Sequence, residues 1–411
     1  MKRQKGFILV QVLIVVACLV ALMAMMAADQ RATLQATQDQ IRHRRAELAA
    51  RSAVAQALSV LQTATTQKVT LLDAWATLGD EGAILYDLGD ATYRMQILDA
   101  ASLINVNTAR NAQLQLLPLD QGSIDCLLDW REPSTQPRAD GAKDAYYNNL
   151  EQPYNARKGR LSSLSEMLLI KGWTAKELYC LPTNISYTNW PEDDNGNELT
   201  LASLFTVDGG SPNTQANGSP RINLGRPGVT QQQLMRLGIN PMLANRILAG
   251  TPYNSFQRLL SIPGLLERDT EALLNGITFS GVTRNEGKIN LNTAKSAVLD
   301  LIPGMTKAIT ASIISKQITG FASLGDLAEI PGVTTTLLPQ LADFFSVGSD
   351  TWLIRAYGES SGVKVAAEVV VRWNNNRLLI QSWENPGGSG LPVWWNWDEK
   401  ATSSTTAGNN E

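Results

Sequence analysis

The chain has 411 residues, of which 44% are hydrophobic and 18% are charged, and its formal net charge is −3. At roughly 150 residues per domain, this length predicts two or three domains. The near balance of charge argues against a general nucleic-acid-binding protein, whose surface is normally basic. With 3 Cys and 1 His, the chain cannot build a zinc framework of the usual spacing, and a Ser-His-Asp or Cys-His site would need His43, which stands in a basic run. The composition therefore argues against most hydrolase chemistry, and we expect a protein that is not an enzyme.

The N-terminal segment has the pattern of a membrane span. Residues 1–6 are short and basic, and residues 7–28 are apolar apart from Gln11. As a helix, this apolar run would be about 33 Å long, enough to cross a bilayer. The basic residues before the run place the N-terminus in the cytoplasm. We expect a single-pass protein of the inner membrane with the bulk of the chain in the periplasm.

Three interpretations compete for this segment. A signal peptide has a shorter apolar stretch of roughly 7–15 residues followed by a cleavage site. A lipoprotein would be modified at Cys18, but here the chain stays apolar after Cys18, where a polar tether is usual. The third interpretation starts from the Gly6-Phe7 junction before the apolar run, which resembles the class III leader of type IV pilins and type II secretion pseudopilins. This resemblance implies that a prepilin peptidase cleaves between Gly6 and Phe7 and that Phe7 is then N-methylated.

Gln11 would be the fifth residue of that mature chain. Most members of the pilin superfamily have Glu at this position, where it is thought to meet the N-terminal amine of the neighbouring subunit. A charged side chain at the bilayer centre costs roughly 2.5–3.5 kcal/mol unless it is paired. Gln11 can form hydrogen bonds but no ion pair, so it is either a tolerated polar residue or the mark of a subunit with no other subunit ahead of it. The same departure is a feature of the K-type minor pseudopilins.

The next elements predict an α+β fold. Residues 7–78 contain no Pro or Gly, and an apolar stripe continues through residues 29–65, as in a long amphipathic helix packed on a globular domain. A hairpin is predicted within residues 66–102, and three further strands within residues 348–385. One long helix and a small antiparallel sheet, paired across a large insertion, is the pilin architecture.

The insertion is predicted to be helical, in residues 103–287 and a second module of residues 288–347. Three passages share an Ile-Asn signature, and two of them run on to Ile-Pro-Gly; the passages are 104–109, 221–224 and 288–294. Thr108 and Thr293 are predicted as helix N-caps. Helix pairs turned by Pro-Gly resemble helix-hairpin-helix, SAM-like modules. Residues 190–220, rich in Asn, Asp, Gly and Ser, are predicted as a linker.

Helix-hairpin-helix modules raise a second functional class, a membrane-anchored DNA receptor. Backbone amides at such hairpins can bind phosphates. Basic and acidic residues are equal in number across residues 288–347, so the counterion-release contribution to DNA binding would be small. We therefore expect no nucleic-acid partner and interpret the modules as packing or protein-contact units.

Residues 124–173 carry the most specific pattern. They contain an Asp129-Trp130 helix end, a Gly-Ala-Lys-Asp-Ala-Tyr-Tyr loop at residues 141–147 and a Leu-Ser-Glu-Met sequence at residues 164–167. With the leader and the terminal strands, the chain resembles the general secretion pathway protein K family over residues 1–385. The resemblance implies a minor pseudopilin at the tip of the type II secretion pseudopilus, which starts assembly with I- and J-type minor pseudopilins and other pseudopilins. A type IV pilus minor subunit is the alternative within this class.

The resemblance also implies a structural calcium ion near this loop. Carboxylates and carbonyls suit such a hard cation, and the candidate ligands are Asp129, Glu132, Asp140 and Asp144. Two residues depart from the family pattern, because Lys143 replaces the usual Glu and Ser134 replaces a common acidic residue. Losing a carboxylate and adding a cation should weaken calcium binding, and the alternative is a loop held by its own hydrogen bonds.

Two further predictions concern cysteines and the C-terminus. Cys126 and Cys180 flank the loop, and outside the cytoplasm they could form a disulfide worth about 4 kcal/mol in the chain-entropy model. Residues 386–411 are predicted to be a disordered tail. The Trp cluster at residues 394–397 either closes a sheet edge, which we favour, or binds a partner.

Overall fold

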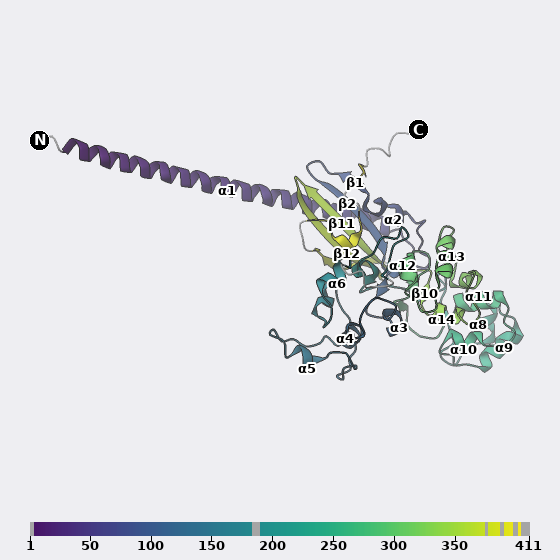
Figure 1. The fold of residues 1–411 in the computed structure, drawn as a ribbon. Coiled ribbons are helices and arrows are strands. Elements are labelled where there is room, and N and C mark those ends of the chain that lie inside the picture. Colours follow the sequence, from purple (N-terminus) through teal and green to yellow (C-terminus); the bar gives the residue numbers. More distant parts are fainter. Residues whose placement is uncertain (1–3, 183–189, 375–376, 387–389, 398–401, 404–411) are drawn as a thin grey trace, which may run out of the picture.

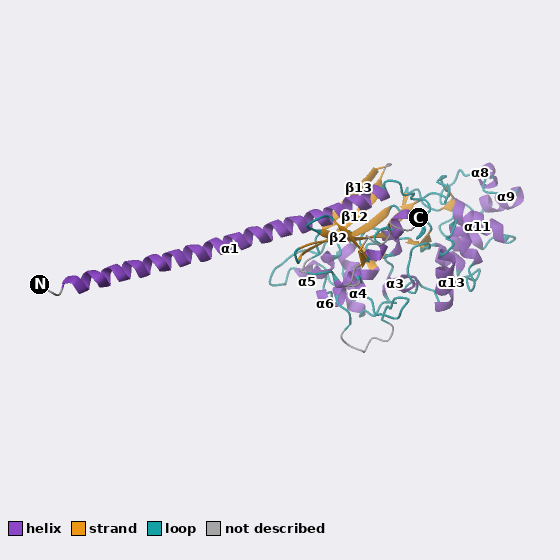
Figure 2. Ribbon diagram, turned by 90° about the horizontal axis from the view of Figure 1, so that it is seen from above, coloured by secondary structure: helices purple, strands orange, loops and turns teal. Residues whose placement is uncertain are grey.

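A long helix projects from a globular body (Figure 1). The computed structural model describes residues 4–182, 190–374, 377–386, 390–397 and 402–403. Helix α1 (Gln4–Leu61) is one continuous helix of 58 residues, as the absence of Pro and of any Gly after Gly6 predicts. Its first half stands clear of the body, and its second half lies along a sheet (Figure 2).

The sheet joins segments from the two ends of the chain. Strand order is β13-β12-β11-β2-β1-β14, with β2 paired antiparallel to β11. The pairing around a large insertion is thus confirmed. Only the β1–β14 pair is parallel among the described strands of this sheet. The bounds are β1 (Ile84–Asp87), β2 (Thr92–Asp99), β11 (Thr351–Ser360), β12 (Val363–Asn374), β13 (Arg377–Glu384) and β14 (Thr402–Ser403).

Small residues let α1 approach this sheet closely. Ala50, Ala53 and Ala57 are buried against a face that includes Trp352 and Ile354. Gly358 in β11 lies directly beneath the helix, and a Cβ added there would stand 2.0 Å from the carbonyl oxygen of Ala46. The second half of α1 is therefore a fixed part of the core.

The other face of the sheet is covered by the Trp cluster. In the 3-10 helix η5 (Val393–Trp395), Trp395 is buried against Tyr357 and Ala366, and its indole donates to Glu368. The prediction that these residues close a sheet edge is wrong in that detail, because they pack across a face. Of the predicted disordered tail, residues 390–397 and the short strand β14 are ordered parts of the body, and most of residues 398–411 lie outside the described residues.

The insertion consists of three modules, each closed by a short parallel strand pair. We define module I as residues 104–206, module II as residues 222–278 and module III as residues 289–346. The pairs join Ile104 to Phe205, Ile222 to Ile277 and Ile289 to Phe345. All three modules contribute to one continuous hydrophobic core.

The module bounds follow in chain order. Module I contains β3 (Ile104–Asn105), α3 (Asn111–Leu114), α4 (Gln121–Arg131), α5 (Asp144–Tyr147), η3 (Ser165–Leu169), α6 (Ala175–Tyr179), α7 (Leu201–Leu204) and β4 (Phe205–Thr206). Module II contains β6 (Ile222–Asn223), α8 (Gln231–Met235), α9 (Pro241–Ala249), α10 (Phe256–Leu260), α11 (Glu267–Gly276) and β7 (Ile277–Thr278). Module III contains β9 (Ile289–Asn290), α12 (Ser296–Leu299), α13 (Lys307–Gln317), η4 (Leu324–Glu329), α14 (Leu338–Ala342) and β10 (Phe345–Ser346). Outside the modules lie α2 (Ala74–Thr77), η1 (Asp80–Gly82), η2 (Ala100–Ser102), β5 (Gly210–Pro212) and β8 (Arg284–Glu286).

Glycines with a left-handed backbone turn the helix pairs. Gly264, Gly304 and Gly332 each follow a Pro and have φ between 84° and 90°. Gly172, with φ of 86°, turns the η3–α6 pair in the same way without a preceding Pro. Module I is therefore a third copy of the helix-hairpin-helix arrangement, which sequence spacing revealed only for modules II and III.

Two local predictions need correction. Thr108 and Thr293 are not N-caps, because α3 and α12 begin later, after Arg110 and Lys295. Residues 190–220 are not a plain linker, because they contain α7, β4 and β5, and β5 pairs with β8.

Candidate functional site

The first half of α1 presents apolar side chains that nothing in the described chain covers. Between Phe7 and Met26, large apolar side chains are more than half exposed, and Phe7 itself is 67% exposed. An 18-residue window of this helix has a mean hydropathy of 2.8 and is long and apolar enough to cross a membrane. Burial of this much apolar surface in lipid or against other helices is strongly favourable.

Gln11 lies on this uncovered part of α1 and is exposed. Its amide NH₂ can donate hydrogen bonds to a neighbouring helix, and its carbonyl oxygen can accept them, without bringing a charge into hydrocarbon. Gly6 already lies within α1, which starts at Gln4. Cleavage between Gly6 and Phe7 and methylation of Phe7 remain predictions.

A long loop in module I, interrupted by α5, runs from α4 to η3. It holds three of the predicted calcium ligands, Glu132, Asp140 and Asp144, whereas Asp129 lies in the last turn of α4. Lys143 lies in this loop, and its residue is only 4% exposed. The Lys143 ammonium donates to the backbone carbonyls of Asp129 and Glu132, at the last turn of α4. Burial lowers the pKa of Lys143, and the nearby carboxylates of Asp129 and Glu132 oppose that shift. The ammonium thus satisfies two carbonyls at a helix C-terminus, where a positive charge is favourable.

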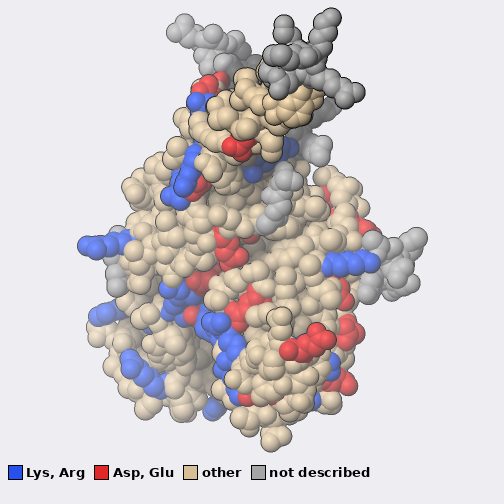
Figure 3. All heavy atoms as spheres, turned by 90° about the vertical axis from the view of Figure 1, so that its left-hand side faces the viewer, with Lys and Arg blue, Asp and Glu red and all other residues tan. Residues whose placement is uncertain are grey.

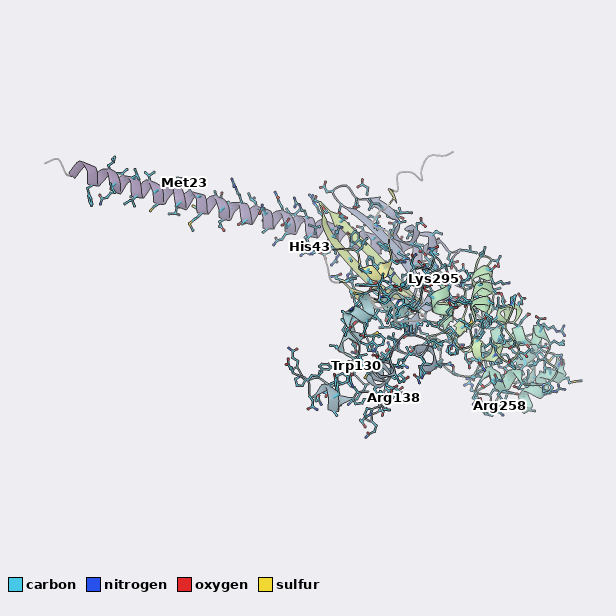
Figure 4. The ribbon with its side chains drawn as sticks, viewed as in Figure 1. Met23, His43, Trp130, Arg138, Arg258 and Lys295 are labelled. Atoms are coloured by element: carbon cyan, nitrogen blue, oxygen red, sulfur yellow. The ribbon has the colours of Figure 1, made fainter. Side chains whose placement is uncertain are left out.

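Arg138 engages two of the predicted ligands directly. Its guanidinium donates to Asp129 Oδ1 at 2.7 Å and to both carboxylate oxygens of Glu132 at 2.7 Å. The Arg138 backbone amide also donates to Asp129 Oδ2 at 3.0 Å. Asp129, with a side chain only 1% exposed, is thus a buried carboxylate compensated by the chain's own cation. Figure 4 shows Arg138 beside Trp130, away from the first half of α1.

The other two predicted ligands lie in separate interactions. Asp144 pairs with Lys158 and accepts the Ala156 amide, and the Lys158 hydrogen bond lowers the pKa of Asp144. The backbone of Asp140 contacts α4, through its amide to Asp125 Oδ2 and its carbonyl to Cys126. The four residues lie between the last turn of α4 and the first residue of α5, but their side chains do not converge on one point.

This arrangement bears on the calcium prediction. Among the described residues, no group of three or more His, Cys, Asp and Glu side chains is gathered as a metal ion would require. The Asp129 and Glu132 oxygens that a hard cation would use already accept from Arg138 and Lys143. A calcium ion here would have to displace one of these cations. Calcium binding stays a prediction, and the residues as arranged do not form a cage for it.

The Cys126–Cys180 disulfide is absent from the structure, in which both thiols are free. Cys126 is buried in α4 with its thiol 3.7 Å from the Asp140 carbonyl oxygen, whereas Cys180 is exposed at the end of α6. Burial raises the pKa of Cys126 to about 11, so its thiol is protonated and unreactive at neutral pH. The prediction from loop closure missed that the helix points this thiol into the core.

A buried carboxylate that sequence reasoning did not single out joins the sheet to module III. Asp99, at the end of β2, accepts hydrogen bonds from the Asn290 amide at 2.8 Å, the Thr293 hydroxyl at 2.6 Å and the Ala101 backbone amide at 2.8 Å. Burial raises the pKa of Asp99, and these hydrogen bonds oppose the shift. Its partners Asn290 and Thr293 lie 191 and 194 positions away in sequence, so only the fold brings them to Asp99.

A second junction centres on Arg284 in β8. Its guanidinium pairs with Asp350 at 2.6 Å and with Asp208 at 3.0 Å, and Arg372 of β12 pairs with Asp208 at 3.1 Å. The network ties β8, the residues after module I and the sheet together. These ion pairs therefore connect the insertion to the sheet.

Comparison with known proteins links this architecture to bacterial secretion. The family model "Type II secretion system (T2SS), protein K" matches residues 105–184, and the model "Helix-hairpin-helix motif" matches residues 284–346. The fold is similar to a chain in the crystal structure of the GspK-GspI-GspJ complex from the enterotoxigenic Escherichia coli type 2 secretion system. That similarity has a TM-score of 0.51 and 14% sequence identity, and it covers 86% of this chain and 99% of that one.

A shorter similarity concerns a different class of protein. The Endonuclease/exonuclease/phosphatase family domain-containing protein 1 of mouse and of human is 38% identical to this chain over 65 residues. The match covers 15% of this chain and 11% of those proteins, so the chain spans about a tenth of their length. A match of this extent carries no information on the activity of the whole protein.

Proposed function

The chain belongs to the type II secretion system protein K family of minor pseudopilins, and from this premise we propose that it occupies the tip of the periplasmic pseudopilus and starts its assembly. The observation that carries the proposal is the union of two parts in one chain: an anchor helix with an uncovered apolar half, and the protein K domain inserted into a pilin-like sheet. Its role is structural and not enzymatic.

The geometry supports a terminal position in a filament. Modules II and III lie at the opposite end of the molecule from the N-terminus of α1, and module I lies beside the sheet (Figure 1). With α1 packed among the helices of other pseudopilins, this bulk projects beyond the helical bundle and leaves no room for a further subunit above it. The inner membrane then holds the first half of α1, and the modules lie in the periplasm.

The partners follow from the same premise. The solved complex contains GspK, GspI and GspJ, and we propose that I- and J-type minor pseudopilins bind this chain, followed by other pseudopilins. Gln11 removes the charge that would otherwise need the amine of a subunit ahead of it. A prepilin peptidase prepares the chain by cleavage after Gly6.

The first experiment is intact-mass analysis and N-terminal sequencing of the protein from cells that contain its native peptidase. We expect a chain that begins at N-methylated Phe7. A chain that begins at Met1, or one with a lipid on Cys18, would contradict the pseudopilin pathway.

A second experiment tests position through Gln11→Glu. If the modules fix the tip position, the variant should still co-purify with the I- and J-type subunits and support secretion with modest change. Dispersal of the variant along the filament, detected by site-specific cross-linking, would show instead that the missing charge selects the position.

A further inference from the structure

The entry strand of each module carries an equivalent Asn, and in two modules this Asn is covered. Asn105 and Asn290 are 2% and 0% exposed. The Asn105 side-chain amide donates to the Gly209 carbonyl, and the Asn290 amide donates to the Val69 carbonyl and the Asp99 carboxylate. In module III the strand entry thus binds a carboxylate, with Thr293 as the second donor.

In module II the same position is open. Asn223 has the same local turn, since its side-chain oxygen accepts the amide of Gly225 at 2.8 Å, as Asn290 accepts the amide of Asn292 at 3.0 Å. Asn223 is half-buried, and within the described part of the chain its side-chain nitrogen has no hydrogen-bond partner. Arg226 stands at the position that Thr293 has in module III.

A cationic groove surrounds this open amide. Its volume is about 680 Å³, and its lining includes Asn223, Arg221, Arg226 and Arg236 but no Asp or Glu. Arg221 donates through Nε to the Thr214 carbonyl at 2.9 Å. None of the three arginines forms an ion pair with a described carboxylate. These arginines therefore line the groove without an ion-pair partner among the described residues.

The groove is also well placed to meet another molecule. Module II lies at the end of the molecule farthest from the N-terminal half of α1, and Figure 4 shows its residue Arg258 at the opposite end from Met23. On the face seen from the N-terminal end, Lys and Arg are mixed with Asp and Glu (Figure 3). A groove lined by one sign of charge is distinct from such a mixed surface.

We propose that this groove binds an acidic segment of another protein through a carboxylate side chain. The Asn223 amide and the guanidinium groups of Arg226 and Arg236 act as donors, as Asn290 and Thr293 do toward Asp99 in module III. Guanidinium groups match carboxylates as planar, two-pronged donors. One part of the inference rests on the proposed function: the choice of a periplasmic protein, and not a nucleic acid, as the partner.

The test is a titration of the full chain in detergent into a fluorescein-labelled hexaglutamate peptide, followed by fluorescence anisotropy. We expect saturable binding that weakens as NaCl is raised, because the contacts are ionic. Arg226→Ala with Arg236→Ala should weaken binding about tenfold or more. The matched control is Arg268→Ala with Arg377→Ala, which removes the same charge from exposed positions outside the groove and should change the Kd less than twofold.

Three outcomes of the peptide titration would overturn the proposal. The first is no saturable binding, and the second is an equal loss of affinity in the groove variant and the control variant. The third is an unchanged affinity in both the Asn223→Ala variant and the Arg226→Ala, Arg236→Ala variant. A labelled single-stranded DNA oligonucleotide forms a separate arm. Tighter, groove-dependent binding of the DNA than of the peptide would also overturn it, in favour of a phosphate ligand. Because the titration needs neither cleavage at Phe7 nor assembly, its failure is distinguishable from failure of the proposed tip function.

Discussion

Modules I and III build the same hairpin arrangement with very different connections. In both, a second Asn fixes the start of the second helix pair: Asn107 accepts the amide of Leu161 and donates to its carbonyl, and Asn292 does the same with Phe321. We call each of these pairs of hydrogen bonds an Asn clamp. The connection between the preceding helix and the Asn clamp consists of residues 318–320 in module III and of residues 132–160 in module I. The Asn clamp, and not the length of the connection, therefore determines how the two helix pairs of a module are placed relative to each other.

The two modules also obtain their stability from different sources. Module III is fixed from outside, by the Asp99 carboxylate at the end of β2. Module I is stabilised from within, because Lys143 and Arg138 of the long connection form hydrogen bonds to residues at the end of α4. A long surface loop is entropically tolerable when such contacts order it.

The largest expected effect comes from Asp99→Ala. It leaves the buried Thr293 hydroxyl without its acceptor and the Asn290 amide with the Val69 carbonyl as its remaining acceptor, and we expect a loss of about 2–4 kcal/mol in the free energy of unfolding. Denaturant unfolding followed by Trp fluorescence measures the loss, with the exposed Asp39→Ala as control. Hydrogen exchange should locate the weakening in module III, and equal weakening of module I would contradict the difference between the modules.

Lys143→Met should loosen module I alone. The variant keeps much of the side-chain volume but removes the donor from the Asp129 and Glu132 carbonyls, at a cost of about 2 kcal/mol. Hydrogen exchange in residues 132–160 should accelerate, while exchange in module III stays unchanged. The matched control is Lys176→Met, at an exposed position of α6. Comparable acceleration of hydrogen exchange in that variant would show that the Lys143 ammonium does not stabilise the connection.

Lys143→Glu tests the calcium prediction directly. The change removes the cation that occupies the loop and adds a carboxylate, so the calcium affinity should rise at least about tenfold over that of the natural chain. Isothermal calorimetry with CaCl₂ measures both proteins, and a chelator should lower the melting temperature of the variant more. Equal affinities would show that Lys143 does not control the loop's response to calcium.

The last prediction concerns the pH dependence of stability and Lys288, which precedes the entry strand of module III. Burial lowers the pKa of Lys288 to about 8. Between this value and the ordinary pKa near 10.5, the unfolded chain binds more protons than the folded chain, so this residue makes stability rise with pH across that window, by at most about 1.4 kcal/mol per pH unit. Lys288→Met should flatten the curve of unfolding free energy against pH between 8 and 10, and an unchanged slope would contradict the assignment.

Much of the architecture follows from local patterns. The absence of Pro and Gly from residues 7–78 predicts the long helix α1, and the strand patterns predict a hairpin within residues 66–102 and three strands within residues 348–385, where β1, β2, β11, β12 and β13 lie. The Ile-Pro-Gly turns predict the helix pairs of modules II and III. These features depend on residues near one another in the chain, and single-sequence patterns are most reliable for such features.

The remaining features depend on long-range contacts. Module I escaped recognition as a third copy because residues 132–160 break the spacing and Lys171-Gly172 replaces Pro-Gly, although the Ile-Asn-x-Asn entry at residues 104–107 was a usable signal. The candidate ligands Asp129 and Asp144 lie at the end of α4 and the start of α5, and their pairing with Arg138 and Lys158 could be seen only in the fold. Asp99 gave no signal, since an isolated Asp at a strand end is ordinary.

The parallel strand pairs place the first and last residues of every module side by side. A pulling force that enters a module at one end and leaves at the other is therefore carried by the hydrogen bonds of the strand pair, and the helices beyond it bear little of the load. Along the main path, the force passes through the eight-residue register of β2 and β11, from Trp352↔Asp99 to Glu359↔Thr92, whose hydrogen bonds are loaded together in shear. A subunit driven forward by a growing filament would thus transmit mechanical load through its sheet while its modules keep their shape.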